Sequence, residues 1–384
     1  MSNSLSVHFD QLVPPLHGSA KFFGAQVREL VRQGHQCRVM SLFKPEGALG
    51  MGQDLGLLDA PYHSFGSQGD VAMRMFGVPC TGPMQGAGRI PVHLWRALAD
   101  SGAEHVLLGD EYGEGAFHVL RALQTNPRPV VIYFVHVLHN LPFGPVAMTP
   151  NPAFEDVMER IDSFVTTSRF AADYLRALTD KPVRVVYPQA REPNTKRGGN
   201  SATLINPSVW KGIDIFLALA DRCPDLPFLA VPGWGTTPKD RHALAARSNI
   251  EVIEWQADVD EIWARTRVLL APSVWAENFG MVALEAGLAG IPVLASDQGG
   301  LPEATLGVRA PISVRPLQMP AKPGGACFVP PQDVAEWEGP LRNLMQDSEI
   351  HTACATAVRD AAHEFVATTK WSDRDLWGLI AGIS

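Results

Sequence analysis

The sequence contains few features that would tie it to a membrane, to nucleic acid or to a secretory route. No apolar run approaches the roughly 18 residues needed to cross a bilayer, so no integral membrane segment is expected. Lys and Arg number 32 against 40 Asp and Glu, and the resulting net charge of -8 argues against nucleic acid as a partner. The first residues lack a basic stretch followed by an apolar one, so no secretory signal is expected.

Cysteine is scarce as well. The five cysteines are scattered and form no C-x-x-C pair, which excludes a disulfide framework or a zinc site as the basis of the fold. A reducing, cytoplasmic setting is therefore predicted. No Walker loop, no nucleophile elbow and no complete glycine-rich dinucleotide motif is present.

What the sequence does contain is a regular alternation of short apolar runs with helical patterns. With 384 residues, 46% of them hydrophobic, two or three domains can each bury a core. Strands are expected at 5–9, 36–42, 105–108, 130–136, 164–167, 183–187, 202–205, 228–231, 250–254, 268–271, 292–295 and 327–329. Expected helices include 22–32, 116–123, 213–221, 259–264, 281–288 and 333–345. This alternation predicts an α/β protein with doubly wound parallel sheets.

The alternation pauses at the polar, glycine-containing segment 191–201, which is typical of a linker. We therefore expect two Rossmann-like domains facing a cleft, at 1–190 and 191–370. The last helix, expected at 373–383, is predicted to return to the first domain with residues 371–384. The segment 47–88 is rich in glycine and has no clear period. It is either an acceptor-binding flap or an excursion with no specific role.

Two carboxylates lie around one expected helix start, in the stretch PSVWAENFGMVALEAGLAG. The helix at 281–288 is apolar nearly all round, so Glu285 needs a partner there. Glu277 lies between the preceding strand and the helix. A helix N-terminus at the carboxyl edge of a parallel sheet binds anions, so the pair indicates a nucleotide-sugar pocket. The alternative is that both glutamates pair with arginines for structure.

Other turns point toward the same edge of a sheet. Lys211, followed by Gly212 on a strand-to-helix turn, can direct its ammonium group at a diphosphate. The glycines at 299–300 allow close approach to a ligand, although an ordinary turn explains them almost as well. Gly18 opens a helix after the first strand and offers a second phosphate-facing turn.

Histidines and acidic pairs complete the candidates. His136 ends an apolar strand, where it can contact a sugar or a leaving group, and His139 can take the same role; a buried core histidine is the alternative. Asp258 and Asp260 superficially match a metal-binding pair, but they precede a helix and are expected to cap it. The pair at 110–111 lacks the further ligands a metal would need.

With these residues in hand, the chain resembles the retaining GT-B glycosyltransferases of the glycosyltransferase-4 family. The strongest similarity is PSVWAENFGMVALEAGLAGIPVLASDQGGLPE, which has the family's two glutamates separated by seven residues and its Gly-Gly-x-Pro-Glu loop. Weaker similarity covers almost the whole chain, including VTTSRFAADYL and the Lys211–Gly212 turn.

The resemblance implies roles for individual residues. Glu277 would bind hydroxyls of a donor sugar, helped by the backbone of Phe279, Gly280 and Met281. Glu285 would hold the nucleotide ribose. Such enzymes use no metal and no cofactor, because cations and backbone amides stabilise the departing nucleoside diphosphate, which arrives as part of the co-substrate.

The remaining implied contacts concern the diphosphate and the reacting carbon. Lys211 would neutralise the diphosphate, Gly18 would let the first domain approach it, and His136 would contact the donor sugar. The family usually has an arginine five residues before the lysine, where this chain has Asn206. Asparagine donates hydrogen bonds but carries no charge, so Arg247 or Arg169 would have to compensate, or leaving-group stabilisation would be weaker.

Three functions are therefore carried forward. The first is a metal-independent, retaining transfer of a sugar from a nucleoside diphosphate to a soluble small-molecule or glycan acceptor. The second is another GT-B chemistry, such as a nucleotide-sugar epimerase or a phosphorylase. The third is a nucleotide-sugar-binding protein with weakened activity, for which Asn206 is the support.

Overall fold

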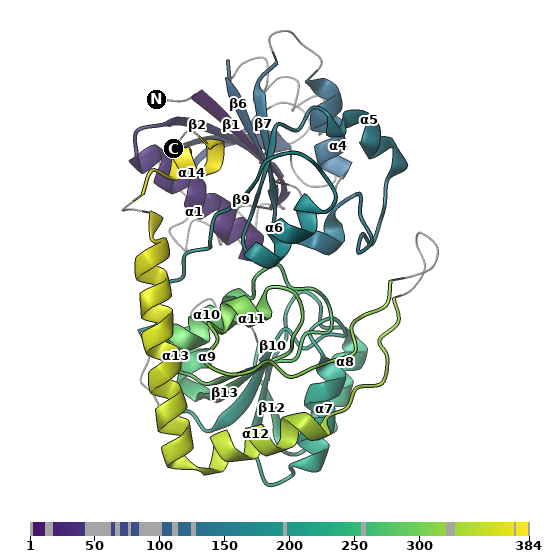
Figure 1. The fold of residues 1–384 in the computed structure, drawn as a ribbon, viewed down its shortest axis with the longest axis vertical. Coiled ribbons are helices and arrows are strands. Elements are labelled where there is room, and N and C mark those ends of the chain that lie inside the picture. The colour runs from purple at the N-terminus through teal and green to yellow at the C-terminus, as the bar shows by residue number, and fades with distance from the viewer. Residues whose placement is uncertain are drawn as a thin grey trace. The chain divides into compact units, whose positions relative to one another are not determined.

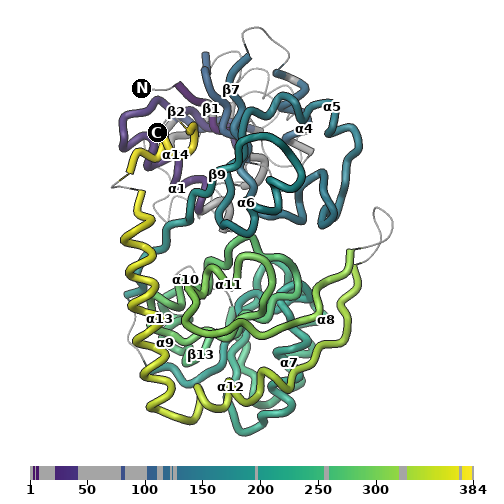
Figure 2. Tube along the Cα trace, viewed as in Figure 1, coloured from purple at the N-terminus to yellow at the C-terminus, as the bar shows by residue number. Residues whose placement is uncertain are grey.

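The computed structural model describes most of the chain, and its elements are shown in Figures 1 and 2. The chain forms two compact units. Unit 1 comprises Met1–Thr167, Ala172–Pro188 and Trp371–Ser384, and unit 2 comprises Ser168–Ala171 and Gln189–Lys370. The sequence-based boundary between 190 and 191 lies close to this division. The described residues are 3–11, 18–42, 63–65, 70–75, 78–83, 102–109, 114–123, 128–194, 198–254, 259–319, 327–371 and 374–382.

Unit 1 is built on a nine-stranded sheet in the order β3-β4-β5-β2-β1-β6-β7-β8-β9. Its parallel strands are β1 (Asn3–Gln11), β2 (Gln36–Leu42), β6 (His105–Gly109), β7 (Val130–Val135), β8 (Ser163–Thr166) and β9 (Val183–Val185). Its helices include α1 (Gly18–Arg32), α4 (Glu114–Ala122), α5 (Glu155–Met158) and α6 (Arg169–Arg176) from Ala172 onward, with single 3-10 turns at Leu138–Asn140 and Pro152–Phe154. Strand β7, whose sequence is VVIYFV, is buried along all but its first residue, as a strand covered on both faces must be.

One edge of this sheet departs from the prediction. Within the segment 47–88, β3 (His63–Phe65), β4 (Asp70–Met75) and β5 (Val78–Pro83) form an antiparallel meander. Strand β5 joins β2 in parallel, with Val39 opposite Cys80. No strand was predicted in this segment, because short strands interrupted by glycine and proline carry little periodic signal.

Unit 2 contains a five-stranded, fully parallel sheet in the order β12-β11-β10-β13-β14. The strands are β10 (Ser201–Ile205), β11 (Phe228–Val231), β12 (Ile250–Val252), β13 (Thr266–Ala271) and β14 (Val293–Ala295). The helices are α7 (Ile213–Arg222), α8 (Pro238–Ala245), α9 (Asp260–Arg265), α10 (Met281–Leu288), α11 (Leu301–Ala304), α12 (Ala335–Gln346) and α13 (Ser348–Thr369). The strand expected at 327–329 is wrong: Phe328 forms only an isolated bridge with Gln318.

The helices of unit 2 divide between the two faces of its sheet. In Figure 1, α7 and α8 lie on one side of β10, and α9, α10 and α13 lie on the other. The chain therefore changes face between the neighbouring strands β10 and β13. Ligands of doubly wound domains bind at such a switch point, beyond the carboxyl ends of the strands.

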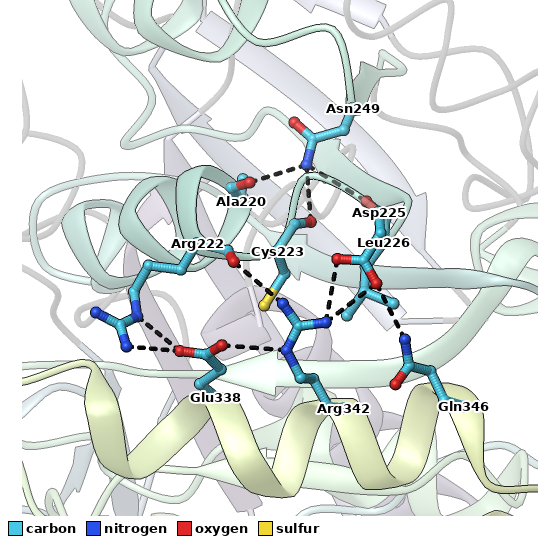
Figure 3. Close-up of polar contacts among 9 residues, drawn as sticks. All are labelled: Ala220, Arg222, Cys223, Asp225, Leu226, Asn249, Glu338, Arg342 and Gln346. Atoms are coloured by element: carbon cyan, nitrogen blue, oxygen red, sulfur yellow. Dashed lines mark hydrogen bonds and ion pairs between the residues drawn. The ribbon is translucent and has the colours of Figure 1, made fainter.

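Helix α12 is fixed by a polar network around its Arg342, drawn in Figure 3. Arg342 reaches Glu338 one turn earlier and Asp225 at 3.0 Å, and it donates to the carbonyl oxygen of Arg222. Asn249 closes the same corner by donating to the carbonyl oxygens of Ala220, Cys223 and Leu226. This network lies at the C-terminal end of α7, at the sheet edge opposite the switch point.

The C-terminus packs into unit 1 through α14 (Leu376–Ala381). Leu376, Trp377 and Ile380 are buried in the same core cluster as Phe23 of α1. Gln33, just after α1, donates to the carbonyl oxygen of Arg374 at 2.8 Å and accepts from the backbone of Leu376 at 3.1 Å. Among the described residues, no helix is both long enough and apolar enough to cross a membrane.

Candidate functional site at the switch point of unit 2

The loops that follow β10 and β13 bring Lys211 and Glu277 together. The Lys211 ammonium group forms an ion pair and hydrogen bond with Oε1 of Glu277. Ser273 donates to the same oxygen at 2.6 Å. The side chains of Lys211 and Glu277 are only 21% and 12% exposed, so water screens this pair weakly.

The charge on Glu277 is maintained by these neighbours. Burial alone would raise the pKa of the Glu277 carboxyl. The charge of Lys211 and the hydrogen bonds from Lys211 and Ser273 outweigh burial and leave this pKa below its usual value. Glu277 is therefore a carboxylate at neutral pH, ready to accept hydrogen bonds from hydroxyl groups.

The two loops are tied to each other by backbone contacts. Gly212 precedes α7 with a φ of 75°, and a Cβ there would overlap the Pro272 carbonyl group. The backbone N–H of Val274 donates to the carbonyl oxygen of Trp210 at 3.0 Å. The conformational freedom of Gly212 is thus used to press the Lys211 turn against the Glu277 loop.

The N-terminus of α10 opens beside Glu277. The helix spans Met281–Leu288, as predicted, and Gly280 precedes it with a φ of 108° and no side-chain cap. An uncapped helix start leaves backbone N–H groups able to bind an anion. Phe279 is 3% exposed and stacks on Phe365 of α13 at a ring-centroid distance of 5.8 Å, so α13 holds this loop in place.

Glu285 lies one turn into α10. Ala283, Leu284 and the residues of the last turn are buried, whereas Met281, Val282 and Glu285 are partly exposed. The i, i+4 spacing puts Met281 and Glu285 on one stripe of the helix. The expectation that Glu285 interrupts a fully buried surface is wrong in this detail, since α10 keeps one half-exposed face.

The glycines at 299–300 serve the protein backbone. Gly299 has a φ of 64° and forms an isolated bridge with Glu277, and the Gly300 N–H donates to the Glu277 carbonyl oxygen at 2.7 Å. A Cβ on Gly300 would come 2.5 Å from the carbonyl oxygen of Asn278. The close approach predicted for these glycines is to the Glu277 loop, whose backbone they hold.

Asn206 also has a structural task. It follows β10 with a left-handed φ of 58°, is 7% exposed, and accepts a hydrogen bond from the Gly235 N–H at 2.9 Å. Its Nδ2 has no hydrogen-bond partner among the described residues, and neither has the Oγ of Ser208. Leaving such a buried group unpaired costs about 1–3 kcal/mol.

The two cations suggested as substitutes for the missing arginine are engaged elsewhere. Arg247 binds Asp221 at 2.7 Å, at the C-terminal ends of α7 and α8. Those ends lie at the far edge of the sheet, because each helix runs antiparallel to its strands. Arg169 pairs with Glu303 at 3.1 Å. The suggestion that Arg247 compensates for Asn206 is therefore wrong.

A cluster of three tryptophans was missed by the sequence analysis. Trp210, Trp234 and Trp275 follow β10, β11 and β13, and their ring centroids lie 5.6–6.2 Å apart. The Lys211 ammonium group lies 5.0 Å from the Trp275 ring. A usable signal existed, since Trp210 is adjacent to Lys211 and Trp275 is two residues from Glu277.

The histidines and Gly18 belong to unit 1. His136 directly follows β7, which ends one residue earlier than predicted, and its ring lies 5.3 Å from Phe22 and 6.3 Å from Phe23. Both phenylalanines lie on the helix that begins at Gly18. His139 is 3% exposed, with Nδ1 2.9 Å from the Val146 carbonyl oxygen, and both ring nitrogens of His136 are buried as well.

Among the acidic pairs, Asp260 is described. It is the first residue of α9, but no side chain caps this helix. The Asp260 carboxylate instead accepts from Arg191 at 3.3 Å and from the Asn194 N–H at 3.0 Å, so the capping prediction is wrong for this residue. Asp258 and the pair at 110–111 lie outside the described residues.

Comparison with known proteins finds a family similarity within unit 2. Residues 201–347 match the family model described as "Glycosyl transferases group 1". A stretch of 93 residues is 32% identical to an uncharacterized 42.6 kDa protein of the Klebsiella pneumoniae cps region. That match covers 24% of this chain and about a quarter, 25%, of that protein's length.

Solved structures resemble the whole chain in fold at low sequence identity. A glycosyltransferase from Rickettsia africae has a TM-score of 0.63 at 12% identity, with 97% of this chain and 99% of that chain covered. Anabaena Alr3699/HepE in complex with UDP-glucose has a TM-score of 0.64 at 12% identity, covering 99% and 98%. TarM has a TM-score of 0.68 at 9% identity, covering 99% of both chains; a variant of TarM from S. aureus also matches. Residues 201–347 are thus similar to group 1 glycosyl transferases, and the chain has the GT-B fold of two Rossmann-like units.

Proposed function

We propose that this chain transfers a sugar from a nucleoside diphosphate to an acceptor hydroxyl, with retention of anomeric configuration and without a metal. The observation that carries the proposal is the Lys211–Glu277 pair beside the uncapped start of α10, at the topological switch point of unit 2. The match of residues 201–347 and the UDP-glucose complex of HepE support the donor class.

The resting ion pair suggests how a donor binds. An incoming diphosphate would draw the Lys211 ammonium group away from Glu277, and the first N–H groups of α10 would share the negative charge. Glu277 would then exchange one cationic partner for the hydroxyls of the donor sugar. Ser273 would keep this carboxylate in place during the exchange.

The remaining contacts are proposed from the resemblance. Glu285, on the half-exposed stripe of α10, would accept from the ribose hydroxyls, and the backbone of Phe279, Gly280 and Met281 would line the sugar side. From unit 1, His136 would contact the donor sugar and the turn at Gly18 would face the diphosphate.

In the proposed front-face reaction, the bond between the anomeric carbon and the phosphate oxygen breaks as the acceptor oxygen bonds to the same face. The acceptor proton passes to the departing phosphate. Lys211 and the α10 amides stabilise the charge that develops on the leaving group. We propose a soluble small molecule or a glycan as acceptor.

The test is the Glu277→Gln variant, assayed for transfer from a panel of nucleoside diphosphate sugars. We expect transfer to fall by about 10²–10³-fold, the effect of removing one transition-state contact. Glu254→Gln is the control, because Glu254 also pairs with a cation, Arg241, but is 71% exposed. Full activity of Glu277→Gln would refute the assignment, and NMR of the product's anomeric proton would test retention.

A second candidate is a nucleotide-sugar-binding protein with weakened turnover. It is favoured by Asn206, because an asparagine side chain carries no positive charge. This side chain is already bonded to the Gly235 N–H, and its backbone is left-handed. Calorimetric binding of a nucleotide sugar without turnover across a broad acceptor panel would favour this candidate. Conversion of the donor when no acceptor is present would instead favour an epimerase, and phosphorolysis of a glycoside would favour a phosphorylase.

A further inference from the structure

The tryptophan cluster forms an aromatic surface that continues from the Lys211–Glu277 pair. Trp210 is nearly parallel to both neighbours, with interplanar angles of 25° to Trp234 and 26° to Trp275. Trp275 is 7% exposed, whereas Trp234 is 57% exposed. The three rings form a compact triangle, with one buried ring beside Glu277 and one ring that faces solvent.

The position of this surface follows from the topology of unit 2. Trp210 and Trp234 lie on the loops that lead into α7 and α8, on one side of the switch point. Glu285 lies on α10, which packs on the opposite face of the sheet. A ligand held at Lys211 and Glu277 with its nucleoside end at Glu285, as proposed above, would have the loops of Trp210 and Trp234 on its other side.

The loop that carries Trp234 is shaped to present it. Glycines flank Trp234 on both sides, and their missing side chains let the loop rest on Asn206 and Ser208. A Cβ on Gly233 would come 2.8 Å from Oδ1 of Asn206, and one on Gly235 would come 3.1 Å from Oγ of Ser208. The loop lies on these two residues while its indole ring points outward.

The chemistry around the rings identifies the kind of ligand. A pyranose ring has a face of C–H groups and a rim of hydroxyls, so it needs an apolar plane with hydrogen-bonding groups beside it. The indoles supply the plane. Glu277 and Lys211 lie at its inner end, and two buried groups without partners among the described residues, Asn206 Nδ2 and Ser208 Oγ, lie beneath its loop. An acyl chain would require an enclosing groove instead of a projecting ring.

We propose that Trp210 and Trp234 form a carbohydrate subsite, on which a sugar ring stacks on the side of the switch point away from the nucleoside. The proposal rests on the proposed function for its ligand and narrows it: the ring is either the donor's own sugar or a saccharide acceptor. Stacking on Trp234 then contributes to binding of the sugar and leaves binding of the bare nucleotide unchanged.

The experiment compares wild type with Trp234→Ala by isothermal titration calorimetry, using UDP, GDP, UDP-glucose and GDP-mannose, and then a panel of mono- to tetrasaccharides. We expect Trp234→Ala to weaken sugar binding roughly tenfold, which corresponds to about 1.4 kcal/mol. Trp234→Phe should keep most of the affinity. Phe328→Ala is the matched control, because Phe328 is also 57% exposed in unit 2.

The outcomes separate the sources. A loss for the nucleotide sugar but not the nucleotide assigns the donor's ring, and a loss for free saccharides alone assigns the acceptor's. An equal loss for UDP and UDP-glucose would mean that the base stacks there, and the proposal would be wrong. No difference from Phe328→Ala for any ligand would also overturn it. If wild type binds saccharides through Trp234 but no nucleotide sugar, the subsite stands and the proposed transferase function fails.

Discussion

Glu277 keeps its charge through a lysine and a hydroxyl group, with little help from water. Because these partners hold the pKa of Glu277 below its usual value in the folded state, the carboxylate stabilises the fold at pH values above the unfolded pKa of about 4.3. That contribution is lost as the pH falls through the lower folded-state pKa. The candidate donor site is therefore also a source of acid-sensitive stability.

Removing the cation should reveal this linkage. We expect Lys211→Met to lower the free energy of unfolding at pH 7 by up to about 3 kcal/mol, the lower end for buried pairs, since Lys211 keeps 21% exposure. The difference from wild type should shrink as Glu277 is protonated below pH 4. Chemical denaturation between pH 3 and pH 7 measures both. Arg241→Met, which breaks an exposed pair with Glu254, should cost about 0–1 kcal/mol; an equal cost for both variants would contradict the prediction.

The backbone at Gly212 leaves no room for a side chain. Any Cβ there meets the Pro272 carbonyl group at a left-handed φ, so Gly212→Ala should cost at least about 1–3 kcal/mol. The variant should also bind nucleoside diphosphates more weakly, because the Lys211 turn moves. The control is Gly24→Ala within α1, where a Cβ meets nothing within 4 Å and about 0.5–1 kcal/mol of stabilisation is expected. Wild-type stability of Gly212→Ala in urea would count against the tight contact.

At the scale of elements, the return of the C-terminal segment depends on one side chain of unit 1. Gln33 binds the backbone on both sides of the turn into α14, at Arg374 and at Leu376. We expect Gln33→Ala to loosen residues 374–382, because two backbone groups lose their partner at about 1 kcal/mol each. Hydrogen exchange of these amides measures the effect.

The control for that experiment is Gln346→Ala, since Gln346 also makes a side-chain hydrogen bond, to Asp225 at 3.0 Å, but in unit 2. Exchange in 374–382 should be unaffected there. Unchanged exchange in the Gln33 variant would mean that the apolar contacts of Trp377 and Ile380 suffice to hold α14.

Helices and strands were predicted correctly where the spacing of apolar residues along the sequence matched the burial of those residues in the fold. The strand at 36–42, the strand at 228–231 and the helix at 281–288 were predicted to the residue. Helix α13 was not named at all, because its buried stripe consists of small side chains, Cys354 and Ala362 with Val358, that give a weak apolar signal.

The candidate site likewise has a part that the sequence predicted and a part that it did not. That Lys211 and Glu277 would meet followed from two loops at neighbouring carboxyl edges of a parallel sheet. The tryptophan cluster did not follow, because it depends on how three loops approach one another. The left-handed conformation of Asn206 was hidden for the same reason, since it is set by contact with Gly235. Their roles in donor binding stay predictions.

At the scale of the whole molecule, two compact units should respond differently to ligand. The ion pair and the α10 N-terminus both belong to unit 2. A nucleoside diphosphate at 100 times its Kd should raise the free energy of unfolding of that unit by about 2.7 kcal/mol. Differential scanning calorimetry with and without UDP or GDP would show one shifted transition, and Lys211→Met should abolish the shift. Equal shifts of all transitions would show that the nucleotide is bound by both units.

The three indoles also make unit 2 an optical reporter of its own site. Indole rings held 5.6–6.2 Å apart in fixed mutual orientation couple their electronic transitions, so we expect the three rings to contribute to the near-ultraviolet circular dichroism spectrum. Because the Lys211 ammonium group lies 5.0 Å from one of the rings, its departure toward a diphosphate would alter the spectrum without any label. If the proposed donor binds at Lys211, its entry would therefore be followed in real time by the signal of these three rings.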